Sequence, residues 1–355
     1  MILIFPYLLA SVFTLFLNTL IIFFLLKLAH KFQWYDDNDH RKIHVGEIPR
    51  IGGIGISISF FTGIFIMPIF IGLLSNEIVK YESIAVIWSL LLGAVIVNLV
   101  GILDDFTNLR PLYKLIGQIA ASLVIIFSGN YYTSFYIPFF DITLESNFVG
   151  QIITFIWIIG ITNAINLIDG MDGFSSSITA LISLIMGVTA FVSGNYMQAF
   201  ILFTLFGSIS GFFIFNFPPA KIFMGDSGSL FIGFVLACMP LYTVNEEFSS
   251  YALILGISFL IIPILDTFAA IIRRKIRKVP FHTPDMDHLH HKLLAMGLSE
   301  RVIILLTGII TLITSGSALA FIIYKTTLFI YLQLALWVFA VIFFILLSFK
   351  IKKKL

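Results

Sequence analysis

Long apolar runs, each close to the length that spans a bilayer, alternate along this chain with short polar stretches. An α-helix needs about 20 apolar residues to cross the hydrocarbon core of a membrane. The runs lie at about residues 2–28, 51–74, 84–103, 112–129, 149–168, 174–192, 197–217, 228–244, 250–272, 301–324 and 328–349. This pattern predicts an all-α polytopic membrane protein with about eleven transmembrane helices, in one integral membrane domain over residues 1–355.

The basic residues predict how these helices are oriented. Eleven spans would place the two termini on opposite sides of the membrane. With the amino end outside, the outer loops contain only Lys80 and Lys325, so 19 of the 21 Lys and Arg residues (21 − 2) lie inside. Because Lys and Arg favour the cytoplasmic side, we expect an outer amino end and a cytoplasmic carboxyl end.

The composition excludes a soluble globular domain. Apolar residues make up 59% of the chain and charged residues 11%, and the mean hydropathy is +1.05. The net charge of +2 indicates no particular partner, because the charges are sorted by side; the lipid bilayer is the expected surrounding, and no nucleic acid is expected to bind. Cys238 is the single cysteine and falls in a predicted span, so no disulfide is expected within the chain.

The segment NAINLIDGMDG places polar groups between two apolar runs. Its amides and carboxylates recur every three residues, at Asn163, Asn166, Asp169 and Asp172. On a helix the first three would share one face, and Gly170 and Gly173 would loosen the turn that follows. Such groups are costly to leave unpaired near lipid, so the segment predicts a wall for a hydrated metal or a polar ligand. The alternative is a helix end with capping Asn and Asp residues.

Two further acidic motifs stand at predicted inner helix ends. Asp104 and Asp105 are adjacent carboxylates that repel each other unless a cation offsets them, and Lys114 follows closely. A loop ion pair is the alternative reading of this motif. The other motif is Gly225-Asp226-Ser227-Gly228, where Asp226 or Ser227 could cap the next helix and the glycines would let backbone approach a phosphate.

The first inner loop carries His40, His44 and Arg50 just before Gly52-Gly53. Glycines at this position would let the backbone come close to a ligand or a neighbouring helix. A solvated basic anchor is the alternative.

The last inner loop carries His288, His290 and His291 as HLHH. The motif lacks the companion Cys or His pair of a structural zinc site, and on a helix His290 would point away from the other two histidines. Hydrogen bonding to phosphate or sugar is therefore preferred over zinc. Asp266, inside the preceding span, is either functional or a structural pair to a neighbouring helix.

Aromatic residues around Pro138 in the outer loop 130–148 predict a membrane-interface belt on a short hairpin, without chemistry. Every other polar cluster apart from Asp266 lies at an inner helix end. The pattern thus predicts one shared site at the cytoplasmic face. Carboxylates beside Arg, Lys and His suit an exchange between two phosphate-bearing substrates, whose charges must be screened from each other.

The order of these motifs resembles a known family, the polyprenyl-phosphate N-acetylhexosamine-1-phosphate transferases, which include the phospho-N-acetylmuramoyl-pentapeptide transferases. The resemblance covers nearly the whole chain. It rests on RKIHVGEIPRIGG, Asp104-Asp105 with Lys114 and Gln118, NAINLIDGMDG, NFPPAKIFMGDSGS and HLHH.

The resemblance implies roles for these residues. Asp104 and Asp105 would be the catalytic pair that serves the lipid phosphate, and Asp226 and Asp169 would hold Mg²⁺, with Mn²⁺ as the alternative ion. The expected substrate-binding residues come from these motifs, from the histidine motif and from the first loop. They are Lys114, Asn166, Asp169, Asp172, Asn216, Phe223, His288, His290, His291, Arg50 and His44.

The resemblance also implies an activity. The expected enzyme is a Mg²⁺-dependent phosphotransferase of the bacterial inner membrane. It would transfer N-acetylglucosamine-1-phosphate from a UDP-N-acetylhexosamine to undecaprenyl phosphate and release UMP. This reaction would initiate an envelope polysaccharide such as teichoic acid or lipopolysaccharide. HLHH is similar to the N-acetylglucosamine branch, but another UDP-sugar stays an alternative. The rival from another class is an ion-coupled transporter, suggested by the many spans and by Asp266. The oligomeric state is open, with a homodimer as one alternative.

Overall fold

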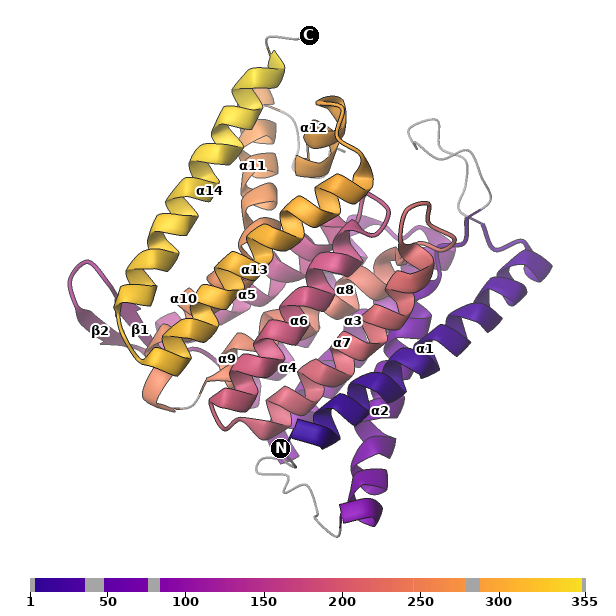
Figure 1. Cartoon of the computed structure of the whole chain (residues 1–355), viewed down its shortest axis with the longest axis horizontal. Coiled ribbons are helices and arrows are strands. Elements are labelled where there is room, and N and C mark those ends of the chain that lie inside the picture. Colours follow the sequence, from indigo (N-terminus) through magenta and orange to yellow (C-terminus); the bar gives the residue numbers. More distant parts are fainter. Residues whose placement is uncertain (1–3, 36–47, 76–83, 245, 279–287, 353–355) are drawn as a thin grey trace.

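The computed structural model describes residues 4–35, 48–75, 84–244, 246–278 and 288–352. Helices make up most of these residues and pack side by side, with two short strands at one end (Figure 1). The first elements are α1 (Phe5–Phe32), α2 (Gly52–Ser75), α3 (Ile84–Thr107), α4 (Pro111–Phe127), β1 (Ser134–Ile137), β2 (Ile142–Glu145), α5 (Asn147–Ile168), α6 (Phe174–Val192) and α7 (Tyr196–Asn216). The others are α8 (Gly225–Cys238), α9 (Pro240–Thr243), the 3-10 helix η2 (Glu246–Tyr251), α10 (Ala252–Phe259), α11 (Ile261–Arg277), α12 (Leu289–Ala295), α13 (Glu300–Tyr324) and α14 (Leu328–Lys352).

The helices confirm an all-α polytopic membrane protein. Among the described residues, 8 helices are long and apolar enough to cross a membrane, or up to 9 if the bent pair α10 and α11 forms one span. Each predicted run has a helix, but α4, with 17 residues, is shorter than a full span, and α14 is not among the 8 helices counted within the described residues. The count of eleven is therefore not confirmed, and the orientation of the termini stays a prediction.

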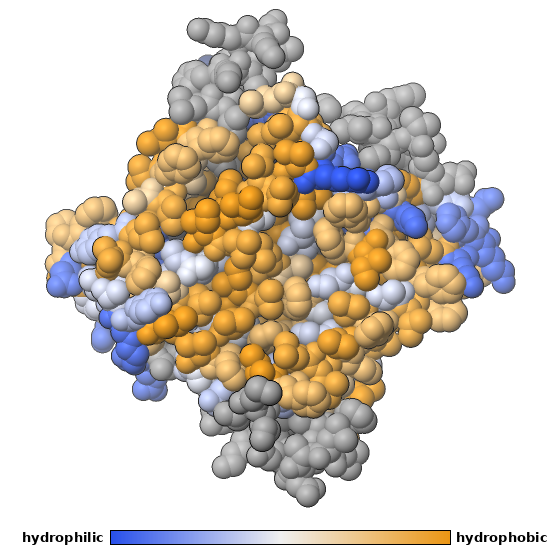
Figure 2. Space-filling view, viewed as in Figure 1, coloured by the Kyte–Doolittle hydropathy of each residue, from blue (hydrophilic) through white to orange (hydrophobic). Residues whose placement is uncertain are grey.

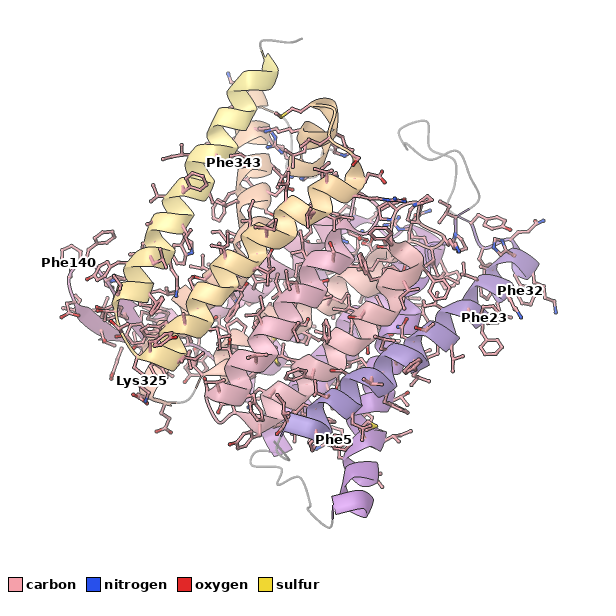
Figure 3. All side chains as sticks on the ribbon, in the orientation of Figure 1. Phe5, Phe23, Phe32, Phe140, Lys325 and Phe343 are labelled. Carbon is pink, nitrogen blue, oxygen red and sulfur yellow. The ribbon has the colours of Figure 1, made fainter. Side chains whose placement is uncertain are left out.

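The molecular surface is arranged as a bilayer requires. Figure 2 shows apolar side chains across the middle of the visible face, with hydrophilic side chains gathered toward two opposite ends. In Figure 3, Phe32 at the end of α1 lies far from Phe140 in the hairpin and from Lys325 before α14. Phe32 and Phe140 thus mark the two ends between which the apolar surface lies.

The span Gly225–Thr243, which begins with α8, is the most deeply buried of the candidate spans within the described residues, with 89% of it buried inside the protein. It packs against α2, α3 and α5. Glycines permit this approach, because a Cβ on Gly101 of α3 would lie 2.5 Å from the Cα of Ser227, and one on Gly233 of α8 would lie 2.9 Å from the Cα of Thr162 in α5. The start of α8 is consequently held between neighbouring helices.

The predicted single span at 250–272 consists of two helices, because α10 and α11 meet at a bend of 72°. The break falls at Leu260, and Pro263 stands in the first turn of α11. Proline has no backbone N–H and tolerates the start of a helix but not its interior. Pro263 therefore fits the first turn of the new helix α11 but would not fit the interior of a helix continued from α10.

The hairpin in the loop before α5 confirms that part of the prediction. β1 and β2 pair antiparallel, with Ser134 opposite Glu145 and Ile137 opposite Ile142. Phe139 and Phe140 in the connecting turn are 81% and 74% exposed, as expected of side chains that meet the headgroup region.

Candidate active site

Two buried carboxylates share one lysine at the end of α3. Asp104 of α3 and Asp226 in the first turn of α8 are 5% and 3% exposed. Lys114 of α4 donates from Nζ to Asp104 Oδ2 at 3.1 Å and to Asp226 Oδ2 at 2.8 Å. A buried charge requires such compensation, and the ammonium group supplies it to both carboxylates.

Arg50 supplies the second cation. Its Nη2 donates to Asp226 Oδ1 at 2.6 Å, and its Nε lies 3.9 Å from Asp105 Oδ1. The arginine is positioned by backbone pairing, because Phe223 N donates to Pro49 O at 2.8 Å and Gly52 N donates to Phe223 O at 2.9 Å. The structure therefore brings Arg50 and Phe223 to one place, as predicted.

His40 and His44 of the first loop fall outside the described residues. The close approach predicted for Gly52-Gly53 is confirmed. A Cβ on Gly53 would collide with the backbone of Gly228 at the start of α8.

The predicted capping of α8 by Asp226 or Ser227 is wrong. The helix begins at Gly225, its N-cap is Met224, and no side chain of the cap residue accepts a hydrogen bond. Asp105 of α3 takes this part instead, because its Oδ1 accepts from Asp226 N at 2.7 Å and its Oδ2 accepts from Ser227 N at 3.0 Å. A carboxylate from another helix thus satisfies the free N–H groups of the first turn.

The acidic residues fit a divalent metal. Asp104, Asp105 and Asp226 each offer a carboxylate oxygen, and these three atoms lie within 4.8 Å of one another. Carboxylate oxygens are the ligands that Mg²⁺ and Mn²⁺ prefer. Lys114 and Arg50 contact the carboxylates of Asp104 and Asp226, so a divalent ion bound there would share these ligands with two cations.

Asp169 lies near this cluster, directly after α5. Burial raises the pKa of its carboxyl, Arg50 opposes this shift, and the carboxylates of Asp226 and Asp105 add to it, so that the pKa lies at about 7. A bound cation would favour the ionised form. Asp169 is therefore placed to respond to the charge held at Asp226.

The row of acceptors predicted on α5 is partly wrong. Asn163 pairs with Gln118 of α4, donating from Nδ2 to Gln118 Oε1 at 2.5 Å. Asn166 donates from Nδ2 to Ser229 Oγ of α8 at 2.8 Å. These amides join α5 to its neighbours, and sequence spacing could not show this because both partners come from other helices.

Asp172 and Asn216 hold the glycine-rich turn against the loop before α8. Asp172 Oδ2 accepts from Ala220 N at 2.8 Å. Asn216 Oδ1 accepts from Gly173 N at 3.1 Å, and its Nδ2 donates to Ile222 O at 2.9 Å. The structure thus places both predicted residues beside the site and shows them shaping its wall.

The three histidines form one cluster with Asp266. His288 Nδ1 lies 2.7 Å from Asp266 Oδ2, and Leu289 N donates to Asp266 Oδ1 at 2.7 Å. Asp266 is therefore the structural pair that the sequence left as an alternative. The prediction that His290 points away from the others is wrong, since its ring lies 6.0 Å from that of His288 and 4.2 Å from that of His291. His288 precedes α12 in extended backbone, so helical spacing does not apply to it.

His290 reaches the NAINLIDGMDG turn. It is 1% exposed, and a Cβ on Gly170 would lie 2.8 Å from its Nε2. Burial, followed by the neighbouring His291, lowers the pKa of His290 to about 3, so the ring is neutral at physiological pH. Neither ring nitrogen has a hydrogen-bond partner within the described residues. His290 thus offers neutral ring nitrogens, in contrast to the charged groups around Asp226.

Sequence reasoning missed Arg301 at the start of α13. Its Nη2 donates to Pro218 O at 3.1 Å, and its guanidinium lies 5.4 Å from the centre of the Phe217 ring. It therefore fastens the loop that precedes α8. A basic residue at the first position of a predicted span was the only available signal.

Comparison with known proteins agrees with this arrangement. The model for glycosyl transferase family 4 matches residues 87–244. The probable undecaprenyl-phosphate N-acetylglucosaminyl 1-phosphate transferase of Bacillus subtilis is 35% identical over 82% of this chain and 78% of its own length. The decaprenyl-phosphate N-acetylglucosaminephosphotransferase of Mycobacterium leprae is 34% identical over 75% of this chain and 71% of its own length.

A relative from another branch is also similar. The phospho-N-acetylmuramoyl-pentapeptide-transferase of Lactobacillus johnsonii is 31% identical over 64% of this chain and 73% of its own length. None of these relatives is named as a transporter. With the motifs in family order and the acidic residues gathered at one place, the chain belongs to the polyprenyl-phosphate N-acetylhexosamine-1-phosphate transferases of glycosyl transferase family 4.

Proposed function

We propose that this protein transfers N-acetylglucosamine-1-phosphate from UDP-N-acetylglucosamine to undecaprenyl phosphate and releases UMP. The observation that supports it most is the charge pattern around Asp226, where two cations and adjacent carboxylates meet at one helix start. Two phosphate-bearing substrates can approach each other only where cations screen their charges. The relatives in Bacillus and Mycobacterium are named for N-acetylglucosamine-phosphate transfer, which favours this sugar.

In the proposed reaction, an oxygen of the lipid phosphate attacks the phosphorus that carries the sugar. The bond between this phosphorus and the bridging oxygen of the diphosphate breaks, so UMP leaves and the sugar keeps its own phosphate. Asp104 faces the attacking phosphate and can accept its proton, while Lys114 and Arg50 offset the charge on the phosphates.

Asp226 and Asp169 would hold Mg²⁺, or Mn²⁺ in its place, against the diphosphate. The ion would supply charge neutralisation to the leaving UMP. We assign the nucleotide sugar to the wall formed by Asn166, Asp172, Asn216 and Phe223 and to the histidine cluster of His288, His290 and His291, with His44 as a further contact from the first loop.

We place this site at the cytoplasmic face of a bacterial plasma membrane. In the sequence, Arg50 follows Arg41 and Lys42, and the histidine cluster follows the basic end of α11 (Arg273, Arg274, Lys275 and Arg277). Basic residues at helix ends favour the cytoplasm. The UDP-sugar would arrive from the cytosol and the polyprenyl phosphate from the bilayer.

A vesicle assay tests this function and its sidedness. Inverted and right-side-out membrane vesicles that contain the protein would receive radiolabelled UDP-N-acetylglucosamine outside, together with Mg²⁺. We expect label in the organic extract from inverted vesicles only. Soluble label inside the vesicles would instead indicate transport, and label in the organic extract from right-side-out vesicles would contradict the cytoplasmic site. UDP-N-acetylmuramoyl-pentapeptide and a UDP-deoxy-N-acetylhexosamine would test the sugar.

A further inference from the structure

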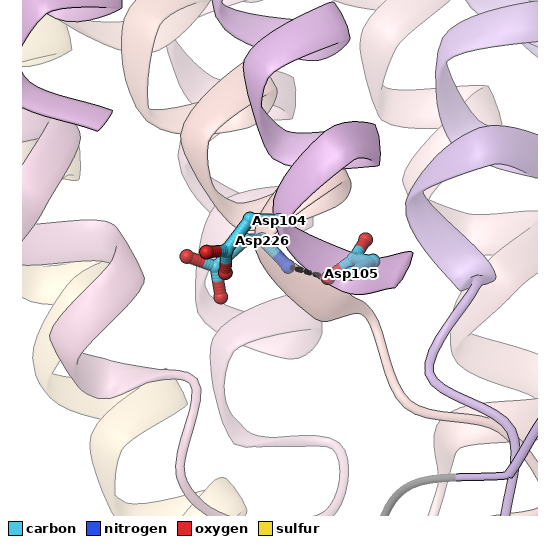
Figure 4. A group of neighbouring side chains, drawn as sticks. All are labelled: Asp104, Asp105 and Asp226. Carbon is cyan, nitrogen blue, oxygen red and sulfur yellow. Dashed lines mark hydrogen bonds between the residues drawn. The ribbon is translucent and has the colours of Figure 1, made fainter. Parts of the chain in front are cut away.

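The neighbouring residues Asp104 and Asp105 face different surroundings. Figure 4 shows the carboxylates of Asp104 and Asp226 close together on one side, while Asp105 points the other way and is joined to the backbone nitrogen of Asp226. Asp104 also contacts Lys114, but no such ion pair to a lysine is formed by Asp105 within the described residues. Adjacent carboxylates in the sequence are therefore not equivalent in the site.

Both oxygens of Asp105 are engaged with backbone. They accept hydrogen bonds from two successive N–H groups, those of Asp226 and Ser227, and the side chain is 0% exposed. A carboxylate held in this way stabilises the positive end of a helix and satisfies N–H groups that have no partner within it. Its position inside the protein leaves it less able to reach a substrate than Asp104.

Gly225 is shaped for this contact. Its φ is +73°, and a Cβ there would lie 2.6 Å from Asp105 Oδ2 and 2.7 Å from Arg50 O. A side chain at Gly225 would therefore both strain the backbone and push the carboxylate away. Glycine at the first position of α8 is what lets Asp105 of α3 reach the next two N–H groups.

A second contact from α3 fixes the same turn. Asn98 of α3 donates from Nδ2 to Ser227 O at 3.0 Å. Asn98 and Asp105 lie on one face of α3, seven residues or about two helical turns apart. Together they bind the donor and acceptor groups of one short segment. The orientation of Asp226, which lies within that segment, follows from this grip.

We propose that Asp105 is a positioning residue, which fixes the first turn of α8 so that Asp226 presents its carboxylate to the metal, while Asp104 alone faces the reacting phosphates. The proposal rests on the proposed function only in giving Asp226 the metal. It assigns different roles to Asp104 and Asp105, which the sequence alone presents as a pair.

The test measures metal binding apart from turnover. Purified protein without substrates would be titrated with Mn²⁺, and free Mn²⁺ would be followed by electron paramagnetic resonance. Asp105→Asn keeps the size of the side chain but turns one acceptor into a donor that faces an N–H group. We expect Mn²⁺ affinity to fall about tenfold, as for the loss of one charge-assisted hydrogen bond, and turnover to recover to within about threefold at saturating Mg²⁺. Asp104→Asn should lose turnover at every Mg²⁺ concentration.

Gly225→Ala provides the second variant, because it displaces Asp105 without changing any carboxylate. It should weaken Mn²⁺ binding as Asp105→Asn does. Gly129→Ala is the matched control, since Gly129 has a φ of +84° but no atom within 4 Å of its added Cβ, and it should bind Mn²⁺ as the parent protein does.

Two results would overturn the proposal. One is unchanged Mn²⁺ affinity in both Asp105→Asn and Gly225→Ala; the other is complete loss of turnover in Asp105→Asn that Mg²⁺ does not restore. If Asp105→Asn fails to fold, Gly225→Ala decides the matter by the same titration. Should the parent protein bind Mn²⁺ through Asp226 but transfer no phosphosugar, the proposed function fails while the positioning result still stands.

Discussion

Two clusters flank the glycine-rich turn after α5, and they differ in charge. Around Asp226, carboxylates are balanced by Lys114 and Arg50 at hydrogen-bond distance. Around His290, burial keeps the ring neutral, and Asp266 grips His288 without reaching His290. The first cluster thus holds charged groups that can contact phosphate and metal, while the second presents the neutral ring of His290.

This difference separates chemistry from recognition. Charged groups act on the phosphates, where charge moves during the reaction. The neutral ring of His290, buried against Phe174 and Gly170, suits the uncharged parts of a nucleotide sugar, because it binds without the cost of removing a charge from water. Changes in the first cluster should lower turnover, and changes in the second should raise the KM for the UDP-sugar.

The largest effect is expected from Asp226→Asn. The substitution keeps size and shape but removes the charge that the ion requires, so turnover should fall about 10²–10³-fold. Initial rates across a Mg²⁺ series and a melting curve would measure activity and folding together. Glu247→Gln is the control, because Glu247 forms an exposed ion pair with Lys325, and it should retain normal turnover. Near-normal rates for Asp226→Asn at low Mg²⁺ would show that Asp226 does not bind the metal.

The comparison itself is tested by Asp104→Asn against His290→Ala. We expect Asp104→Asn to lower kcat about 100-fold with little change in KM, and His290→Ala to raise KM for the UDP-sugar about tenfold with a smaller change in kcat. Steady-state kinetics on both variants would show the contrast. Two variants that change KM alone, by similar factors, would contradict a catalytic Asp104.

A smaller effect is expected from the contact between Asp266 and His288. Asp266→Asn and His288→Asn should each raise KM a few-fold, since each frees the start of α12, and the double variant should be no worse than either single one. A double-mutant cycle on KM measures this coupling. Additive effects would show that the two residues act separately.

The smallest effect is a pH dependence of stability at Asp169. The pKa of Asp169 in the folded protein, about 7, lies above the value of about 3.9 for an Asp in an unfolded chain. Between these two pH values the folded protein keeps a proton that the unfolded chain loses. The free energy of unfolding therefore falls as pH rises through this range. Without metal, Asp169→Asn should therefore raise Tm relative to the parent protein at pH 8 and less so at pH 5. Saturating Mg²⁺ should reverse the difference at pH 8, because only the carboxylate binds the ion. A Tm difference independent of pH would contradict an Asp169 that is protonated in the folded protein.

The sequence predicted the helical runs, the hairpin and the gathering of Asp104, Asp226, Lys114 and Arg50, because apolar length and ordered motifs are local signals. It did not predict that Asp105 caps α8 or that Asn163 pairs with Gln118, since each contact joins two helices and depends on their packing. The bend before α11 was missed for another reason. Pro263 was visible in the sequence, but a proline inside an apolar run can also kink a helix without dividing it.

The positions of the three histidines were also not predicted from the sequence. Helical spacing was applied to His288 although the helix begins one residue later, at Leu289. The preference for hydrogen bonding over zinc at this motif stays a prediction.

The central claim is phosphotransfer with release of UMP, and the identity of the released nucleotide tests it most directly. Purified protein would receive Mg²⁺, undecaprenyl phosphate and UDP-N-acetylglucosamine, and the nucleotides would be separated by chromatography. We expect UMP in an amount equal to the lipid product, and labelled UMP should exchange into the nucleotide sugar once that product is present, because one phosphoanhydride bond replaces another. An attack on the sugar carbon would instead release UDP. Release of UDP without exchange of labelled UMP would contradict the account.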